Sequence, residues 1–375
     1  MLRFLTAGES HGPCLTAIVE GLPAGLLVDV DAINADLRRR QGGYGRGARM
    51  QIERDRAEVL GGVWQGRTTG APLALRIENR DWVNWRDRDL PPLTVPCPGH
   101  ADYAGMIKYG LGDARLVAER ASARETAARV AVGALAKQLL ATFDVAVGSY
   151  VAEIGGVVAM IPDQPPEELW ALAEASDVRC PDEDAATRMR EAIDAAREAG
   201  DSLGGVFVVV ATGVPVGLGS HVHWDRRLDG RLAHAVMSIP AIKGVEIAPA
   251  FENARLAGTQ VHDEILPGAN ASSSFVTRPT NRAGGIEGGM TNGQPAVVRA
   301  AMKPIPTTVT PLRSVDLRTG KAATTQYQRS DVCAVPAAAV VGEAMVAWVL
   351  AQALMEKLGG DSLAEMKTRW QRMES

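Results

Sequence analysis

The chain has 375 residues, of which 46% are hydrophobic, 22% charged and 5% aromatic, and its net charge is -4. This composition allows a large aliphatic core and disfavours disordered and membrane proteins, while the acidic balance argues against a general nucleic-acid-binding protein. Seven of the 40 basic residues are lysine and 33 are arginine. Arginine suits carboxylates and phosphates, but a GC-rich genome also produces this excess. The placement of the arginines therefore has to show whether they bind a ligand.

The cysteines and the apolar segments indicate a compartment. The 4 cysteines are widely separated and form no CxxC pair, which predicts reduced thiols rather than a disulfide framework or a zinc site. The N-terminus has no apolar signal-peptide core. The most apolar stretch, residues 332–355, is interrupted by Pro336 and Glu343, so we expect a buried helix in a cytoplasmic protein rather than a membrane span.

Two apolar helices dominate the predicted elements. The first covers residues 122–143, with Ser122 and Glu125 as an S-x-x-E capping box. The second covers residues 337–358 and stops at Gly359-Gly360. Helices this apolar need a layer on each side.

Strands and amphipathic helices fill the region between these two helices. β-branched runs predict strands over 145–158, 205–212 and 295–304. The pattern between residues 165 and 199 predicts two charged amphipathic helices at the periphery of the fold. Because the chain has no repeat, low-complexity tract or long linker, we predict a single α+β domain over residues 1–375, with 163–200 as a peripheral helical segment.

Histidines and arginines fall in the glycine-rich segments. His11 lies in a Gly-Glu-Ser-His-Gly run, where it could move protons or merely form a turn. Residues 38–49 (RRRQGGYGRGAR) form a basic, glycine-rich loop that suits a small anion better than RNA. The loop is not a Walker motif, and no G-x-G-x-x-G opens a helix.

Three later segments are also candidates for binding or catalysis. His100 stands two residues before Asp102, which could orient it. Arg120 and Arg124 flank the expected start of the first apolar helix, an anion site or simply a capped helix with surface arginines. Residues 280–293 are glycine-rich and precede Lys303–Thr307, and Asp331 follows Arg329, which would keep it ionised.

His221 and His223 have the spacing of two ligands on one face of a strand. No further ligand set stands nearby, and histidines at strand ends are common. We therefore predict no metal site.

Together these motifs resemble the chorismate synthase family. The similarity is carried, in the family's order, by GESHGPCLTAIVEGLPAG, RRRQGGYGRGARM, PGHADYAGMIKYG, ERASARETAARV, SIPAIKGVEIAPAFENA, TNRAGGIEGGMTNGQP, AAMKPIPT and QRSDVCAVPAAAVV, from Gly8 to Val341. The resemblance implies a β-α-β sandwich with long central helices, assembled as a homotetramer. It also implies the last step of the shikimate pathway, an anti-1,4 elimination of phosphate from 5-enolpyruvylshikimate 3-phosphate that gives chorismate and needs reduced FMN.

The resemblance also implies residue roles. His11 would protonate the reduced flavin, His100 would serve the departing phosphate, and Asp331 would be the base that acts through the flavin. The substrate anions would be clamped by Ser10, Arg40, Arg46, Arg49, Arg124 and Arg329, and in some family members the Arg40 and Arg46 region is assigned to NADPH. The FMN-binding residues would be Arg120, Ala121, Ser122, Pro240, Ala241, Gly288, Lys303, Pro304, Ile305, Pro306, Thr307 and Arg329.

Two positions depart from the family pattern. Cys97 stands where members often carry an arginine, and Leu111-Gly112 where they often carry a basic residue. Two other functions stay open: a flavin-dependent oxidoreductase that consumes NADPH, and an RNA-binding protein that uses the arginine loop, which the acidic net charge disfavours.

Overall fold

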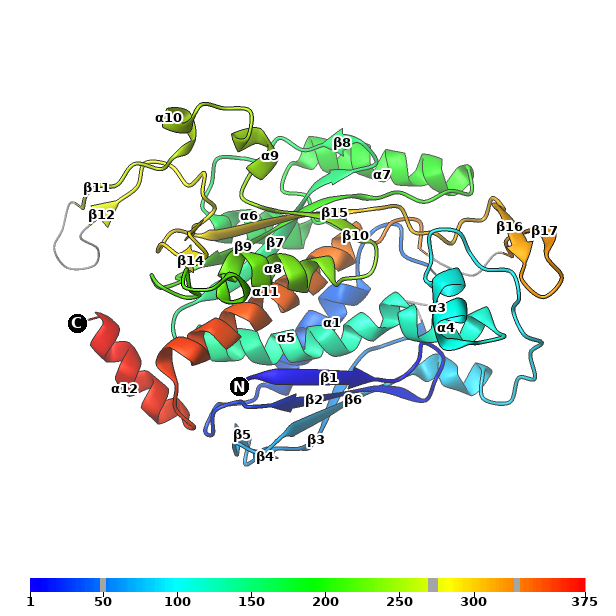
Figure 1. Ribbon diagram of the computed structural model, residues 1–375, viewed down its shortest axis with the longest axis horizontal. Helices are drawn as coiled ribbons and strands as arrows, with labels where there is room; N and C mark the ends of the chain where they lie inside the picture. The colour runs from blue at the N-terminus through cyan, green and yellow to red at the C-terminus, as the bar shows by residue number, and fades with distance from the viewer. Residues whose placement is uncertain (48–51, 269–275, 327–330, 375) are drawn as a thin grey trace.

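The computed structural model describes residues 1–47, 52–268, 276–326 and 331–374. Figure 1 shows three layers, with long helices between two antiparallel sheets. The predicted α+β sandwich with central helices is thereby confirmed.

The first sheet has the strand order β1-β2-β6-β3, and all its pairs are antiparallel. Its strands are β1 Arg3–Ala7, β2 Cys14–Glu20, β3 Ala57–Gly61 and β6 Leu73–Glu78. Along β2, Leu15 and Val19 are buried while Ile18 is 51% exposed, the alternation of a sheet with one face on the core. None of these strands is among the predicted elements, because half of their side chains face outward and dilute the apolar signal.

The second sheet has the order β10-β15-β9-β7-β8 and is also antiparallel. Its strands are β7 Ala146–Ile154, β8 Val157–Val158, β9 Gly205–Thr212, β10 Ile242–Ile247 and β15 Ala296–Met302. The three predicted strands are confirmed. The run 145–158 is divided into β7 and β8 by a turn at Gly155 and Gly156, whose positive φ angles of 59° and 83° suit glycine.

Three helices form the middle layer: α1 Val30–Gln41, α5 Thr126–Ala141 and α11 Val335–Leu358. α5 packs on the first sheet and α11 on the second, and the two pack on each other. α11 is long and apolar enough to cross a membrane by length and composition, yet 89% of its most apolar window is buried. It is the buried helix that the sequence predicts.

The start of α5 differs from the prediction. Ser122 ends α4 (Ala114–Ala121), and residues Ala123–Glu125 form a 3-10 turn, η2, before α5 begins. The Ser122 Oγ therefore accepts from the Arg124 N–H at 3.2 Å, and no capping box with Glu125 forms. The Glu125 carboxylate pairs with Arg129 at 2.7 Å instead.

The two predicted amphipathic helices are α6 Pro166–Ala175 and α7 Glu183–Glu198. They lie outside the five-stranded sheet, as Figure 1 shows. Met189 and Ile193 of α7 are nevertheless fully buried, so this segment contributes to the core as well as covering the surface.

The other elements are short or lie in the connections and near the C-terminus. The helices are η1 Arg80–Asn84, α3 Asp102–Tyr109, η3 Trp224–Arg226, α8 Leu228–Met237, α9 Ala250–Asn253, α10 Gly258–Val261 and α12 Leu363–Glu374. The strands pair as hairpins β4 Val63–Trp64 with β5 Arg67–Thr68, β11 Leu266–Pro267 with β12 Val276–Thr277, β13 Ile286–Glu287 with β14 Met290–Thr291, and β16 Arg313–Asp316 with β17 Lys321–Thr324.

Candidate active site

Most of the predicted site residues gather at one end of the sandwich. β1 ends there, α5 and α11 begin there, and α3 and α4 lie beside them, on the right in Figure 1. Three clusters of side chains make up this end, and we name them the His11, arginine and His100 clusters.

The His11 cluster consists of Ser10, His11, Trp85, Glu119 and Ser122. The Ser10 N–H donates to the Glu119 carbonyl at 3.0 Å, and the Ser122 hydroxyl donates to the Ser10 Oγ at 3.2 Å. Both oxygens of the Glu119 carboxylate bind His11: Oε1 lies 2.6 Å from Nδ1, and Oε2 accepts the backbone N–H at 2.6 Å. The loop after β1 is thus fixed to the end of α4.

Trp85 covers the imidazole of His11. The two rings are stacked, with centroids 3.9 Å apart and planes at 29°. The Trp85 indole N–H donates to the carboxylate of Asp81, which is buried, at 3.0 Å. Neither Trp85 nor Glu119 is predicted as a site residue: both are far from His11 along the chain, and although Glu119 opens the ERASARETAARV motif, nothing local shows that it reaches His11.

The arginine cluster centres on the buried carboxylate of Asp55. Arg124 donates to both of its oxygens at 2.6 and 2.7 Å, and Arg40 approaches it at 3.5 Å. Arg124 also donates to Asn79 at 2.8 Å, and Asn79 donates to the carbonyls of Glu9 and Gly12, which links this cluster to the His11 loop. Burial lowers the pKa of Arg40 to about 10 against the attraction of Asp55.

Arg46 and Asp331 lie next to the arginine cluster. The Arg46 guanidinium is 2.6 Å from the Asp331 carboxylate, whose other oxygen accepts the Gly47 N–H at 2.6 Å. The predicted neighbour of Asp331 was Arg329. Arg329 and Arg49 lie outside the described residues.

The His100 cluster consists of Cys97, His100, Asp102, Lys303 and Pro306. The His100 Nδ1 contacts one oxygen of the buried Asp102 carboxylate, and the other oxygen accepts the Cys97 N–H at 3.0 Å. The Cys97 thiol faces the Pro306 carbonyl at 3.2 Å. Burial and Asp102 raise the pKa of the thiol while Lys303 opposes them, and burial together with Lys243 lowers the pKa of Lys303.

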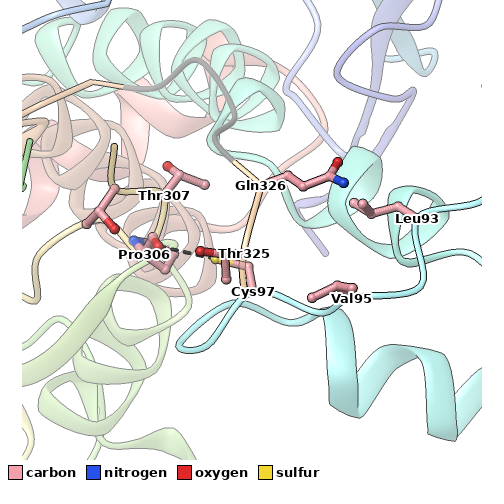
Figure 2. A pocket seen from close by; sticks show the side chains of 8 residues that line it. Leu93, Val95, Cys97, Pro306, Thr307, Thr325 and Gln326 are labelled. Atoms are coloured by element: carbon pink, nitrogen blue, oxygen red, sulfur yellow. Dashed lines mark hydrogen bonds between the residues drawn. The ribbon is translucent and has the colours of Figure 1, made fainter. Parts of the chain in front are cut away.

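A small pocket adjoins the His100 cluster. Figure 2 shows Cys97 beside Pro306 on its wall, with Thr307 and Gln326 also lining it. A larger cavity of about 310 Å³ lies on the face of the five-stranded sheet turned away from α11. Its lining includes Tyr150 and Arg299 but none of the predicted site residues that the structure describes.

The residues predicted to hold FMN are not all in one place. The Lys303 N–H donates to the Ala241 carbonyl at 2.9 Å, so Pro240, Ala241 and Lys303–Thr307 are neighbours of the His100 cluster. Arg120 is about half exposed and donates to Thr6 at 3.0 Å. Gly288 lies in the β13–β14 hairpin at the opposite end of α8 from Pro240, roughly 15 Å away by the rise of a ten-residue helix.

His221 and His223 precede η3 in an exposed turn, not in a strand. His223 binds Asp225 at 2.7 Å. The described part of the chain contains no cluster of three or more histidine, cysteine or carboxylate side chains that could hold a metal ion.

Two histidine–carboxylate pairs beside buried arginines are side chains typical of enzymes that act on anionic substrates. A family model described as chorismate synthase matches residues 2–355. The chorismate synthase of Geobacter sulfurreducens is 55% identical over 99% of this chain and 98% of its own length, and that of Desulforamulus reducens is 56% identical with the same coverage.

A solved structure titled "Crystal Structure of Chorismate Synthase" superimposes with a TM-score of 0.81 at 46% identity, covering 99% of this chain and 97% of that one. The chain belongs to the chorismate synthase family. It is a carbon–oxygen lyase that eliminates phosphate from 5-enolpyruvylshikimate 3-phosphate to give chorismate, in aromatic amino-acid biosynthesis, and its family uses reduced flavin. The oxidoreductase alternative is not favoured.

Proposed function

We propose that the elimination takes place at the end of the sandwich that holds the three clusters. The observation that carries this proposal is the pairing of each candidate histidine with a carboxylate, His11 with Glu119 and His100 with Asp102. The substrate has two carboxylates and a phosphate, and guanidinium groups bind such anions through paired hydrogen bonds. Four described arginines of the predicted site, Arg40, Arg46, Arg120 and Arg124, belong to this end of the fold.

These arginines differ in what they can do. Arg40 and Arg124 are buried and bound to Asp55 and to other protein acceptors. We assign them to the positive potential of the site and to the shape of the 120–126 turn. Arg46 is assigned to direct contact with the substrate anions, with Ser10, Arg49 and Arg329 completing the set. Arg120, which is about half exposed, is assigned to FMN.

The donor set fits reduced FMN as the flavin. Arg120, Lys303 and Thr307 offer two cations and a hydroxyl, which suit a phosphate and the polar edge of a ring, and the paired hydroxyls of Ser10 and Ser122 supply further donors. When bound, reduced FMN supplies the electron-rich group that the elimination needs although the reaction is redox-neutral. Pro240, Ala241, Ala121 and Pro304–Pro306 would form the walls of this site.

The proton steps are assigned to three side chains. His11 holds and delivers a proton on the flavin side, and His100 delivers one to the departing phosphate oxygen. Asp331 is the base for the ring hydrogen, and the Arg46 guanidinium at 2.6 Å keeps its carboxylate in place. A general acid or base in such a position contributes about 10² to 10⁴ in rate.

An anaerobic assay tests the proposal. The chain is incubated with photoreduced FMN and 5-enolpyruvylshikimate 3-phosphate, and chorismate and phosphate are measured. We expect both products in equal amounts, with no net oxidation of added NADPH. Stoichiometric NADPH consumption during turnover would favour the oxidoreductase alternative, and formation of neither product would refute the proposed cofactor and site.

We further propose a cytoplasmic homotetramer that takes reduced flavin from its surroundings, with NADPH as the ultimate reductant. Exposed apolar side chains on the outer face of the first sheet, Leu5 at 76% and Ile18 at 51%, support association of chains. Light scattering after gel filtration should give four times the chain mass of 39.7 kDa. Activity in air with oxidised FMN and NADPH would show instead that the chain reduces its own flavin.

A further inference from the structure

The two candidate catalytic histidines are held by the same arrangement of bonds. In each case one carboxylate oxygen contacts the imidazole Nδ1, and the other oxygen accepts a backbone N–H of the same loop. For Glu119 that N–H is His11's own, and for Asp102 it belongs to Cys97. The two carboxylates lie at very different separations along the chain, Glu119 108 residues after His11 and Asp102 only two after His100.

This arrangement fixes which ring nitrogen carries the exchangeable proton. A carboxylate only accepts hydrogen bonds, so the imidazole must present Nδ1–H to it in both the neutral and the charged form. The proton that the imidazole gains and loses is therefore the one on Nε2. For His11 the stacked Trp85 ring, itself bound to Asp81, also opposes rotation of the imidazole.

We propose that Glu119 and Asp102 are positioning residues that lock His11 and His100 in the Nδ1–H form, and that Nε2 is the working atom of both. The statement about the working atom rests on the proton roles given under the proposed function. The statement about the tautomer stands on the contacts alone. Neither carboxylate touches the substrate in this account, and each acts through its histidine.

The second carboxylate oxygen makes the inference testable by an isosteric change. In Glu119→Gln the backbone N–H of His11 still needs an acceptor, so the amide oxygen must occupy the position of Oε2. The amide NH₂ then faces Nδ1 and donates to it, which forces the neutral ring into the Nε2–H tautomer. The same reasoning applies to Asp102→Asn, where the Cys97 N–H fixes the amide oxygen.

The tautomers can be read by magic-angle-spinning NMR on protein labelled with ¹⁵N only in its six histidines. His11→Ala and His100→Ala assign the two signals by their loss. In the wild-type chain we expect protonated Nδ1 on both rings. We expect protonated Nε2 with unprotonated Nδ1 on His11 in Glu119→Gln and on His100 in Asp102→Asn, and retention of the wild-type signal in Glu119→Asp.

Turnover is measured on the same samples under the anaerobic conditions above. Glu119→Gln and Asp102→Asn should each lower kcat by about 10²-fold with KM nearly unchanged. Glu58→Gln is the matched control, because the Glu58 side chain is 58% exposed on the first sheet, and it should change neither the spectrum nor kcat.

The outcomes separate the inference from the function on which it rests. A wild-type ring with hydrogen on Nε2 alone, or an unchanged tautomer in the amide variants, would overturn the positioning role without any turnover measurement. A switched tautomer with unchanged kcat would overturn Nε2 as the working atom and, with it, the proton role of that histidine. The wild-type tautomers need only the His11→Ala and His100→Ala spectra for their assignment, so they are tested even if Glu119→Gln or Asp102→Asn does not fold.

Discussion

His11 and His100 show how much of this site depends on single contacts. Each ring would be an ordinary turn histidine without its carboxylate, since a partly exposed imidazole with no fixed hydrogen-bond partner has neither a fixed orientation nor a fixed tautomer. Glu119 fixes the orientation and the tautomer of His11, and Asp102 fixes those of His100. The chemistry assigned to the site therefore depends on pairs of residues rather than on the histidines alone.

Removal of either imidazole should affect turnover more than binding. We expect His11→Ala and His100→Ala each to lower kcat by about 10² to 10⁴-fold, since each removes one proton carrier. Flavin binding, followed by fluorescence quenching, should change little, because the proposed flavin donors are other side chains. Wild-type turnover in both variants would contradict the assigned roles.

Single arginine contacts also show whether the excess of arginine over lysine has a structural reason. Arg124 is 2% exposed, binds both oxygens of Asp55 and also donates to Asn79. A lysine cannot form this fork of bonds. At least this part of the arginine excess has a structural reason, whatever the codon usage contributes to the rest.

At the scale of elements, the contact between α5 and α11 sets the thickness of the middle layer. The helices cross at Gly133, where a β-carbon would lie 2.3 Å from the Ala344 Cβ and 2.8 Å from its carbonyl oxygen. Real atoms do not approach so closely, so only glycine lets the helices meet at this distance. Both active-site turns are attached to these helices, η2 before α5 and Asp331 before α11.

Two substitutions of the same kind should therefore have opposite signs. Gly133→Ala is expected to lower the free energy of unfolding by about 1–3 kcal/mol, because the helices must move apart. Gly230→Ala in α8, where an added β-carbon meets nothing within 4 Å, should raise it by about 0.5–1 kcal/mol. Urea unfolding of both variants measures the difference, and a stabilised Gly133→Ala would contradict the described crossing.

At the scale of the whole molecule, one buried carboxylate joins the middle layer to the second sheet. Glu343 of α11 is fully buried and accepts hydrogen bonds from Arg39 of α1, Lys137 of α5, Arg179 and the Ser149 hydroxyl of β7, at 2.6–3.1 Å. Burial by itself would raise the pKa of Glu343, but Lys137, Arg39 and Arg179 hold it far below its ordinary value. Loss of one member of such a network leaves buried charges uncompensated.

The network predicts a pH-dependent stability. Glu343→Gln should lower the free energy of unfolding by about 3–5 kcal/mol at pH 7. Because the folded-state pKa of Glu343 is depressed, its contribution is complete above the ordinary glutamate pKa of about 4.3 and is lost as the pH falls below it. Urea unfolding at pH 7 and at pH 3.5 should therefore show a smaller difference between wild type and variant at the lower pH. A difference independent of pH, or one matched by the exposed control Glu58→Gln, would contradict this role.

The sequence by itself determined the long apolar helices, the β-branched strands and the motifs that carry the candidate site residues. These features depend on local patterns: an apolar run is buried wherever it lies, and each motif carries its own histidine or arginine. The strands of the first sheet were not predicted, because apolar side chains such as Ile18 also face outward and make the alternation of polar and apolar residues irregular. The predicted capping box between Ser122 and Glu125 does not form, because Ser122 is the residue at which α4 ends.

Apart from His100 and Asp102, which are two residues apart and whose contact the sequence predicts, only the tertiary structure decided which side chains meet. Glu119 contacts His11, which is 108 residues away in the sequence. The Asp55 carboxylate binds both Arg40 and Arg124. Arg46 pairs with Asp331, which lies just before α11. No local pattern encodes such partners, because each contact depends on how sheets and helices pack rather than on spacing along the chain. The packing of α1, α5 and α11 on one another thus brings the separate motifs to one end of the sandwich.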